Sequence, residues 1–404
     1  MQTILVVNSG SSSVKFQVFG TDGVSALERL IKGQVSGIGT MPRLFARDAG
    51  GELMIDRAFD AAQIGDVSIA IQTAGAWLRE QLNITPIAVG HRIVHGGPDY
   101  DRPILIDDNA LAVLEKLVCL APLHQPNNLA PIRSIRARFP DLPQIGCFDT
   151  AFHRTHSADA DHYAIPEQYY LEGVRRYGFH GLSYEYIADR LTIVAPDVAL
   201  KKIVVAHLGS GASMCALSGG RSIDSSMGFT ALDGVPMGTR PGQLDPGVVL
   251  YLIEQRGMSP AAVQDMLYHD CGLKGLSGLS NDVRDLEASD DPRAAFALDY
   301  FVYRVGLYAG MLAAALGGID AFVFTAGIGE NSATMRARIA DKLKWLGVDL
   351  DPAANATHAE LISEPRSPVR VYRIATDEEM MIARHTLACL SESSLQRSER
   401  GRVA

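Results

Sequence analysis

Charged side chains stand near the ends of apolar runs of the sequence or between residues that break regular structure. Arg92 lies near the end of the apolar run 86–94, Asp149 follows the run 143–148, and Arg240 is bracketed by Gly-Thr and Pro-Gly. A guanidinium binds a carboxylate or a phosphoryl group through two parallel N–H donors and stays charged at any working pH. Because ligands bind where the strands of α/β folds end, these residues predict a site for small anions. The alternative is that both arginines lie on the surface.

Two loops rich in glycine and serine offer a second kind of anion site. Residues 4–19 and 203–217 each read as an apolar run, a tight turn and a second apolar run, with Gly10 and Gly209 in matching places and Lys15 after the first turn. Such loops let backbone N–H groups and hydroxyls point at one phosphate. Glycine and serine also make ordinary hairpin turns, and each loop alone leaves that alternative open. The repeated plan indicates an internal duplication.

The loop sequences argue against two common nucleotide-binding folds. Neither loop reads G-x-x-x-x-G-K-[ST], and neither reads G-x-G-x-x-G between a strand and a helix, so P-loop and dinucleotide-binding folds lack their sequence signature. A pair of related hairpins favours a two-lobed ATPase of the actin and sugar-kinase type, in which each lobe offers a hairpin to the nucleotide. The segment 321–331 reads as a buried strand, a glycine turn and a helix, which is a third candidate for binding phosphate.

Strands and helices must position these residues, and apolar patterning predicts them for most of the chain. Strands are expected over 1–34, 86–94, 143–148, 203–217, 321–325 and 369–375, and helices over 67–82, 108–120, 183–191, 246–255, 260–269, 292–316 and 377–390, with a further helix ending at 138. Ser183 is expected to cap its helix. The long loop 224–242 is expected to be functional. Residues 35–65 are weakly patterned, and no element is predicted there.

Length and charge bound the class of protein. A chain of 404 residues is too long for one ordinary core, and the repeat divides it near its middle. We therefore expect an N-terminal lobe at 1–150, completed by a C-terminal helix at 377–404, and a C-terminal nucleotide-binding lobe at 151–376. The formal net charge of −9 argues against binding nucleic acid, because that affinity depends on an excess of lysine and arginine.

Neither a membrane segment nor a zinc site is expected. The longest uncharged run, 305–319, falls short of the roughly 20 residues that span a bilayer, and the N-terminus shows no secretory signal. Five cysteines without a C-x-x-C pair indicate reduced thiols in the cytosol. His91 and His95 lie four residues apart on a strand without nearby cysteines, which argues against zinc.

Six motifs together resemble the acetokinase family, the acetate kinases, and follow that family's order from residue 3 to about residue 390. They are Asn8-Ser9-Gly10-Ser11-Ser12-Ser13-Val14-Lys15, His91-Arg92-Ile93-Val94-His95-Gly96-Gly97, Phe148-Asp149-Thr150-Ala151-Phe152-His153, Tyr177-Gly178-Phe179-His180-Gly181, Met237-Gly238-Thr239-Arg240 and Gly327-Ile328-Gly329-Glu330-Asn331. The resemblance implies an α/β protein with the two-lobed, duplicated ribonuclease-H-like fold of the actin and sugar-kinase type and an active site in the interdomain cleft. It also implies a cytoplasmic homodimer that uses Mg²⁺, with Mn²⁺ as a substitute. The implied reaction is reversible direct phosphoryl transfer from ATP to acetate, giving acetyl phosphate and ADP.

The resemblance also implies a role for each matching residue. Asn8 and Glu378 would hold the magnesium ion, and Lys15 would face the nucleotide phosphates. Arg92 would bind the substrate carboxylate, in a pocket lined by Val94, Leu123, Phe179 and Ala231. The catalytic residues would be Asp149, His180, Arg240, Arg92 and His124. The nucleotide loops would be His207, Leu208, Gly209, Ser210 and Gly211, then Asp282, Val283 and Arg284, then Gly327, Ile328, Gly329, Glu330 and Asn331.

Four positions depart from the common pattern of the family. Ser210 and Asp377 each stand where asparagine is usual, Tyr184 where histidine is usual, and Ala231 where proline is usual. Ser210 keeps a hydrogen-bonding side chain, so we expect nucleotide binding to survive. Ala231 removes ring atoms from the substrate pocket, so we expect acetate to be preferred and propionate to be accepted.

The residues alone leave other roles and other functions open. Acetate is already ionised at pH 7, so no general base is required, and Asp149 would organise metal and water or align the substrate, with proton transfer as the alternative. His180 alone also reads as a core side chain. A nucleotide-gated binding protein is disfavoured because the chain ends within about 25 residues of Glu378. A sugar kinase would need a catalytic base instead of a carboxylate-binding Arg92.

Overall fold

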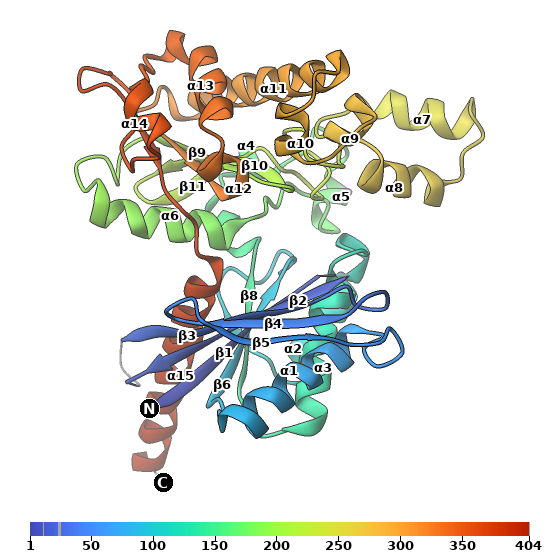
Figure 1. Cartoon of the computed structure of the whole chain (residues 1–404), viewed down its shortest axis with the longest axis vertical. Helices are drawn as coiled ribbons and strands as arrows, with labels where there is room; N and C mark the ends of the chain where they lie inside the picture. Colours follow the sequence, from blue (N-terminus) through green and yellow to red (C-terminus); the bar gives the residue numbers. More distant parts are fainter. Residues whose placement is uncertain (11, 23–25, 404) are drawn as a thin grey trace. The chain divides into compact units, whose positions relative to one another are not determined.

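The computed structural model describes residues 1–10, 12–22 and 26–403, with side chains only up to residue 392. The chain forms two compact units (Figure 1): Met1–Ala151 together with Asp377–Ala404 make the first, and Phe152–Thr376 makes the second. Ser11 of the first glycine-rich turn and residue 404 of the expected C-terminal helix lie outside the described residues.

The first unit is built on an eight-stranded sheet with the order β5-β4-β3-β2-β1-β6-β8-β7. The strands are β1 (Gln2–Ser9), β2 (Ser13–Thr21), β3 (Leu27–Ser36), β4 (Arg43–Asp48), β5 (Leu53–Ala58), β6 (Ala88–Ile93), β7 (Ile104–Leu105) and β8 (Gln144–Phe148). β1 pairs antiparallel with β2 and parallel with β6, and β6 pairs parallel with β8. The β4–β5 hairpin lies in the segment for which the sequence predicted no element.

Helices cover both faces of this sheet. They are α1 (Val67–Leu82), α2 (Asp108–Lys116), the 3₁₀ turn η1 (Leu117–Leu120), α3 (Gln125–Arg138) and α15 (Glu378–Val403). Val89 packs into the core beneath α1, and the next residue, Gly90, faces α15 on the opposite side. A Cβ at Gly90 would lie 2.7 Å from Cγ2 of Ile382, so only glycine lets α15 approach β6 this closely. Figure 1 shows α15 on the side of the sheet away from α1 and α3.

The second unit repeats this plan with a five-stranded sheet in the order β11-β10-β9-β12-β13. Its strands are β9 (Ile203–Leu208), β10 (Ala212–Ser218), β11 (Arg221–Ser225), β12 (Ala321–Thr325) and β13 (Arg370–Arg373). The β9–β10 hairpin corresponds to β1–β2, and β12 and β13 lie parallel beyond it, as β6 and β8 do. The predicted duplicated, two-lobed α/β fold is confirmed.

Helices of unequal length surround the second sheet. They are α4 (Ala158–Asp161), α5 (Glu167–Leu171), α6 (Gly181–Val194), α7 (Pro246–Glu254), α8 (Pro260–His269), α9 (Gly272–Ser277), α10 (Val283–Glu287), α11 (Pro292–Leu316), α12 (Ala326–Asn331), α13 (Ala333–Lys342) and α14 (Pro352–Ala356), with 3₁₀ turns η2 (Ala151–Thr155) and η3 (Lys344–Leu346). The bounds of α8 and α11 agree with those predicted. Within the described part of the chain, no helix is both long and apolar enough to cross a bilayer.

The expectation that Ser183 caps its helix is wrong. α6 begins at Gly181 and takes His180 as its N-cap residue, with φ of 58°. The Ser183 N–H already donates to the His180 carbonyl at 3.0 Å, so Ser183 lies in the first turn. The sequence did not reveal this start because a non-glycine residue rarely adopts the left-handed conformation.

The buried His91 of β6 predicts a pH dependence of stability. Its Nε2 lies 2.8 Å from Oε1 of Gln144, and burial lowers its pKa from 6.5 to about 4. Below pH 6.5 the unfolded chain therefore binds a proton at this histidine, whereas the folded chain does not. The free energy of unfolding consequently decreases as the pH is lowered. We expect a loss of about 2 kcal/mol between pH 8 and pH 5 from this group.

The measurement is urea unfolding at both pH values for the wild type and for His91→Gln, whose amide still donates to Gln144. The variant should lose about 2 kcal/mol less than the wild type over this pH range. Equal losses in the two proteins would show that His91 titrates normally when folded.

Candidate active site

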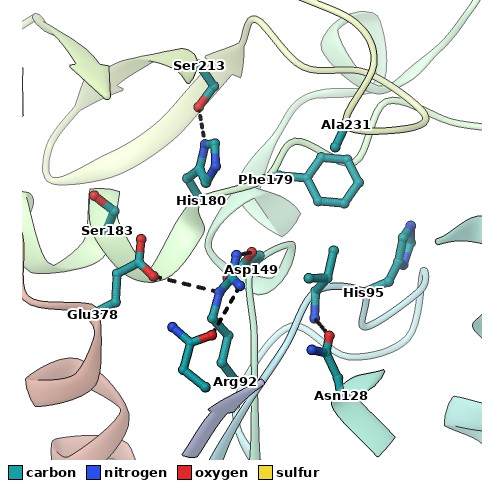
Figure 2. A network of polar contacts seen from close by, with 12 residues as sticks. Arg92, His95, Asn128, Asp149, Phe179, His180, Ser183, Ser213, Ala231 and Glu378 are labelled. Carbon is teal, nitrogen blue, oxygen red and sulfur yellow. Dashed lines mark hydrogen bonds and ion pairs between the residues drawn. The ribbon is translucent and has the colours of Figure 1, made fainter. Parts of the chain in front are cut away.

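A half-buried guanidinium forms the centre of the polar residues in the first unit. Arg92, near the end of β6, donates from Nε to Oδ1 of Asp149 at 3.1 Å and from Nη2 to Oδ2 at 2.5 Å. Its Nη1 lies 3.4 Å from Oδ1 of Asn8, and its Nε lies 3.7 Å from Oε2 of Glu378. Figure 2 shows the carboxylates of Asp149 and Glu378 turned toward Arg92. The structure thus brings together four of the predicted site residues.

The strand order explains this convergence. β1, β6 and β8 are neighbours and run parallel, so Asn8, Arg92 and Asp149 lie at the same edge of the sheet. The Asp149 N–H donates to the Ile93 carbonyl at 3.0 Å, which fixes the carboxylate beside β6. Glu378 reaches the same edge because it is the first residue of α15.

Burial and crowded charge set the protonation of this cluster. The side chain of Asp149 is 1% exposed and that of Glu378 is 16% exposed. Burial raises the pKa of Glu378 to about 7, an effect that Arg92 and Lys15 oppose and that Asp149 and Glu379 reinforce. Burial also raises the pKa of Asp149, with Arg92 acting in the opposite direction. The carboxylates outnumber the cations nearby, so an added cation would stabilise them.

The residues present fit a Mg²⁺ site in which the substrate supplies some of the ligands. No group of three His, Cys, Asp or Glu side chains among the described residues could by itself hold a metal ion. Mg²⁺ commonly uses one or two carboxylates, several waters and substrate phosphates. The amide oxygen of Asn8 and the carboxylate of Glu378 are oxygen donors of that type.

Two buried amides hold this edge of the first unit, and the sequence did not predict their roles. Asn128 accepts from the Val94 N–H at 2.9 Å and donates to the Ser9 carbonyl at 2.7 Å. It thereby ties the end of β1 to the residue that follows β6. Gln125 both accepts from the N–H of His95 and donates to its carbonyl. The sequence signal that could have indicated these roles is the pair of amide residues, Gln125 and Asn128, in the first turn of α3.

Asp377, one of the departures from the family pattern, has a structural partner. Its Oδ1 accepts from the Met380 N–H at 3.0 Å, at the start of α15. Its Oδ2 forms an ion pair with Arg29, which also donates to Gln17. A carboxylate at this position therefore anchors α15 to strands β2 and β3.

The other predicted residues of the first unit lie around this cluster. Lys15 is exposed and stands opposite Asn8 in the β1–β2 pair. It lines a hollow of about 610 Å³ together with Glu379, whose Oε1 accepts from the Asn8 amide at 3.3 Å. Leu123 and His124, just before α3, are half-buried, whereas Val94 is buried.

In the second unit, hydrogen bonds orient the imidazole of His180. Its Nδ1 lies 2.8 Å from Oγ of Ser213, which also lies 2.5 Å from the Tyr184 hydroxyl. A Tyr184 hydroxyl that donates to Ser213 leaves the Ser213 hydroxyl free to donate to Nδ1. That direction places the ring proton of neutral His180 on Nε2. Tyr184, where the family usually has histidine, thus contacts the hydroxyl group that orients His180.

His207 lies parallel to His180. The two rings stack with centroids 4.2 Å apart and an interplanar angle of 11°. Nδ1 of His207 lies 2.8 Å from Oγ of Ser183, which donates to Oγ1 of Thr376. Because the Ser183 hydroxyl proton is used in that bond, His207 donates from Nδ1. The sequence reading did not identify Ser183, Ser213 or Thr376 as parts of the site.

Arg240 and His180 converge on Gly211. A Cβ at Gly211 would lie 2.8 Å from Nη2 of Arg240 and 3.4 Å from Nε2 of His180, so glycine leaves both groups room. Nη1 of Arg240 donates to the Ala231 carbonyl at 2.7 Å. In Figure 2 the Ala231 methyl points toward the ring of Phe179.

The three predicted nucleotide loops line one pocket. It has a volume of about 500 Å³ and is lined by Gly209, Ser210, Asn281, Asp282, Val283, Arg284, Glu287, Gly327, Ile328, Asn331 and Ser332. Gly327 has nothing within 4 Å of a built Cβ, so its backbone is open to a ligand. By contrast, Glu330 turns inward, and its Oε1 accepts from the N–H groups of Ala326 and Thr376.

A fully buried arginine supports the third loop. Arg336 donates from Nη1 to the carbonyls of Gly329 and Glu330, at 3.0 and 2.9 Å, and from Nε to Asn355 at 2.7 Å. Burial lowers its pKa to about 10, with Arg373 acting in the same direction. Carbonyl and amide oxygens of Gly329, Glu330 and Asn355 thus accept from this guanidinium. The side chain holds α12 in place.

Comparison with known proteins agrees with the resemblance found in the sequence. The model of the acetokinase family matches residues 3–384. An acetate kinase of Nitrobacter hamburgensis is 67% identical over 404 residues, which is 100% of each chain, and one of Rhizobium meliloti is 61% identical over 97% of this chain and 99% of its own.

Solved structures show the same relationship. The acetate kinase of Porphyromonas gingivalis superposes with a TM-score of 0.86 at 35% identity, covering 96% of this chain and 100% of the other. A propionate kinase of Francisella tularensis superposes with a TM-score of 0.89 at 35% identity, covering 96% and 99%. The chain belongs to the acetokinase family.

Proposed function

We propose that this protein transfers the γ-phosphoryl group of ATP reversibly to acetate, giving acetyl phosphate and ADP. The observation that carries the proposal is the half-buried Arg92, held at a sheet edge by carboxylates that fix the direction of its N–H groups. A protein that phosphorylates a carboxylate needs such a cation for its acceptor. The pocket formed by the glycine loops of the second unit supports nucleotide binding there.

The reaction brings one anion to another, so the protein must position and neutralise charge. Asp149 uses both oxygens to hold Arg92, and we assign it to aligning this guanidinium. Arg92 then presents Nη1, which has only a 3.4 Å contact to Asn8, to the acetate carboxylate. The attacking oxygen carries its own lone pair and negative charge, so no proton has to be removed.

His180 and Arg240 would contact the phosphoryl group being transferred. Nε2 of His180 and Nη2 of Arg240 both face Gly211, and both are N–H donors in the arrangement described above. Asn8 and Glu378 would hold Mg²⁺, which would neutralise charge on the nucleotide phosphates when bound. Lys15, opposite Asn8 in the hairpin, adds a further positive charge on the side of the phosphates.

The proposal is tested by incubating the protein with ATP, Mg²⁺, acetate and hydroxylamine, which traps acyl phosphates as hydroxamates. Acetate-dependent hydroxamate is the expected product. ATP hydrolysis without hydroxamate would favour a nucleotide-gated binding protein. ADP formation that depends on a sugar would favour a sugar kinase.

We also propose a cytoplasmic homodimer that pairs through the second unit. α11 exposes Phe296, Tyr303, Leu307 and Met311 along one face, each between 46% and 57% exposed. α7 has no buried residue, although it carries several large apolar side chains. Exposed apolar patches of this kind mark protein interfaces. The five cysteines are all in the reduced state, which supports a reducing compartment.

Leu307→Glu should break this dimer, because it places a charge in the middle of the apolar face. Sedimentation equilibrium should show a dimeric wild type and a monomeric variant. Ile193→Glu is the matched control, since Ile193 is 67% exposed on α6, and it should remain dimeric. A monomeric wild type, or a dimeric Leu307→Glu, would contradict the proposed interface.

Arg240→Ala should lower kcat steeply and KM for acetate much less, because a contact made mainly in the transition state affects the rate alone. Its loss should cost on the order of 10²-fold or more in kcat. Arg240→Lys keeps the charge without the planar fork and should recover little, whereas added guanidine should restore part of the rate to Arg240→Ala. An unchanged kcat with a raised KM would make Arg240 a ground-state binder.

Ala231→Pro should narrow the substrate pocket while keeping the carbonyl that accepts from Arg240. Known structures of an acetate kinase and a propionate kinase resemble this chain equally in identity, so overall similarity does not decide substrate length. One methylene is discriminated by about 1–3 kcal/mol. Competition assays should show kcat/KM for propionate falling about fivefold more than for acetate; an unmoved ratio would place Ala231 away from the pocket.

A further inference from the structure

We propose that His153 is a positioning residue for His180: it holds the carbonyl of Phe179 and thereby the backbone turn that presents the His180 imidazole. The inference rests on the proposed role of His180 in phosphoryl transfer. All the residues involved belong to the second unit.

The contact that carries the proposal is a single buried hydrogen bond. His153 is fully buried, and its Nε2 lies 3.0 Å from the carbonyl oxygen of Phe179. A carbonyl only accepts, so Nε2 carries the ring proton. Phe179 directly precedes His180, and its carbonyl belongs to the peptide that links the two residues. Fixing this oxygen therefore fixes the plane of the peptide on which His180 turns.

The other ring nitrogen completes a directed chain of hydrogen bonds. Nδ1 of His153 lies 2.8 Å from Oγ of Ser222, which must donate to it. Ser222 is then left to accept, and Nε2 of His156 lies 2.8 Å from the same oxygen. Burial lowers the pKa of His153 well below 6.5, and the neighbouring His156 acts in the same direction. His153 is thus held neutral in one tautomer.

His180 needs such a hold because its backbone is strained. Its φ of 58° is in the left-handed region, which costs a non-glycine residue about 1–3 kcal/mol unless its surroundings impose it. Gly178, two residues earlier, has φ of 72°, and a Cβ there would lie 2.7 Å from the His153 ring. The imidazole of His153 is therefore packed directly against the turn 178–180.

The same ring also touches the second support of His180. The rings of His153 and Tyr184 meet edge to face with centroids 5.6 Å apart, and the Tyr184 hydroxyl contacts the Ser213 oxygen that orients Nδ1 of His180. His153 thus contacts both the backbone and the side-chain supports of His180.

The test compares His153→Gln with His153→Met, two side chains of similar length that differ in the ability to donate to the Phe179 carbonyl. His153→Met should lower kcat by about tenfold or more, because a small misplacement near the reacting group is costly, with KM for ATP and acetate changed less than threefold. His153→Gln should retain more of the rate. Leu191→Ala, a buried change on α6 far from this turn, controls for loosening of the helix.

A double-mutant cycle with His180→Ala decides whether His153 acts through His180. In the His180→Ala background, His153→Met should lower kcat by less than twofold further. An equal loss in both backgrounds, or equal rates for His153→Gln and His153→Met, would overturn the proposal.

A readout without turnover separates this inference from the proposed function. A wild type that makes no acetyl phosphate would refute the function. Imidazole ¹⁵N spectra would still decide the positioning role, because the His180 resonances should move in His153→Met and stay near the wild-type values in His153→Gln. Unmoved His180 resonances in both variants would overturn it.

Discussion

The Arg92 guanidinium, which is only 19% exposed, joins three segments of the first unit. A charge that is largely removed from water needs partners, and removing those partners destabilises the fold. Asn8, Asp149 and Glu378 supply its partners from β1, from the end of β8 and from the start of α15. The unit cannot satisfy Arg92 unless these three segments are assembled, so the residues proposed to bind acetate also stabilise the fold.

The second unit holds backbone strain at two of its proposed phosphate-facing loops. His180 and Ala326 are non-glycine residues with φ of 58° and 64°, and each stands at the start of a helix at a proposed phosphate-facing loop. A hydrogen bond with a neighbouring polar side chain fixes each of these two turns. His153 holds the carbonyl that precedes His180, and Glu330 accepts from the Ala326 N–H. Strain at these places, supported by buried polar groups, keeps the loops in one conformation before any ligand arrives.

The sequence predicted best those helix bounds that local residues determine. α8 and α11 begin at Ser-Pro and Asp-Pro, and α11 ends at a left-handed glycine, so their bounds could be read directly. The β4–β5 edge hairpin buries few side chains and carried no clear alternation.

Within the site, motifs located Arg92 and Asp149, but not which atoms would meet. Arg92 and Asp149 are 57 positions apart in the sequence, and Arg92 and Asn8 are 84 positions apart. The supporting roles of Asn128, Ser213 and Arg336 also depend on partners outside their own segments, so no local pattern announced them.

The helix that closes the first unit has a consequence for the order in which the chain folds. α15 packs on β1, β6 and β8 and meets β6 at Gly90, yet it is made more than 200 residues after those strands. On a ribosome, residues 1–151 emerge with one face of their sheet uncovered, whereas residues 152–376 form a continuous segment that can complete its core first. The half of the protein that is synthesised first is therefore the half that finishes folding last, and its uncovered face is the surface that a chaperone would meet during synthesis.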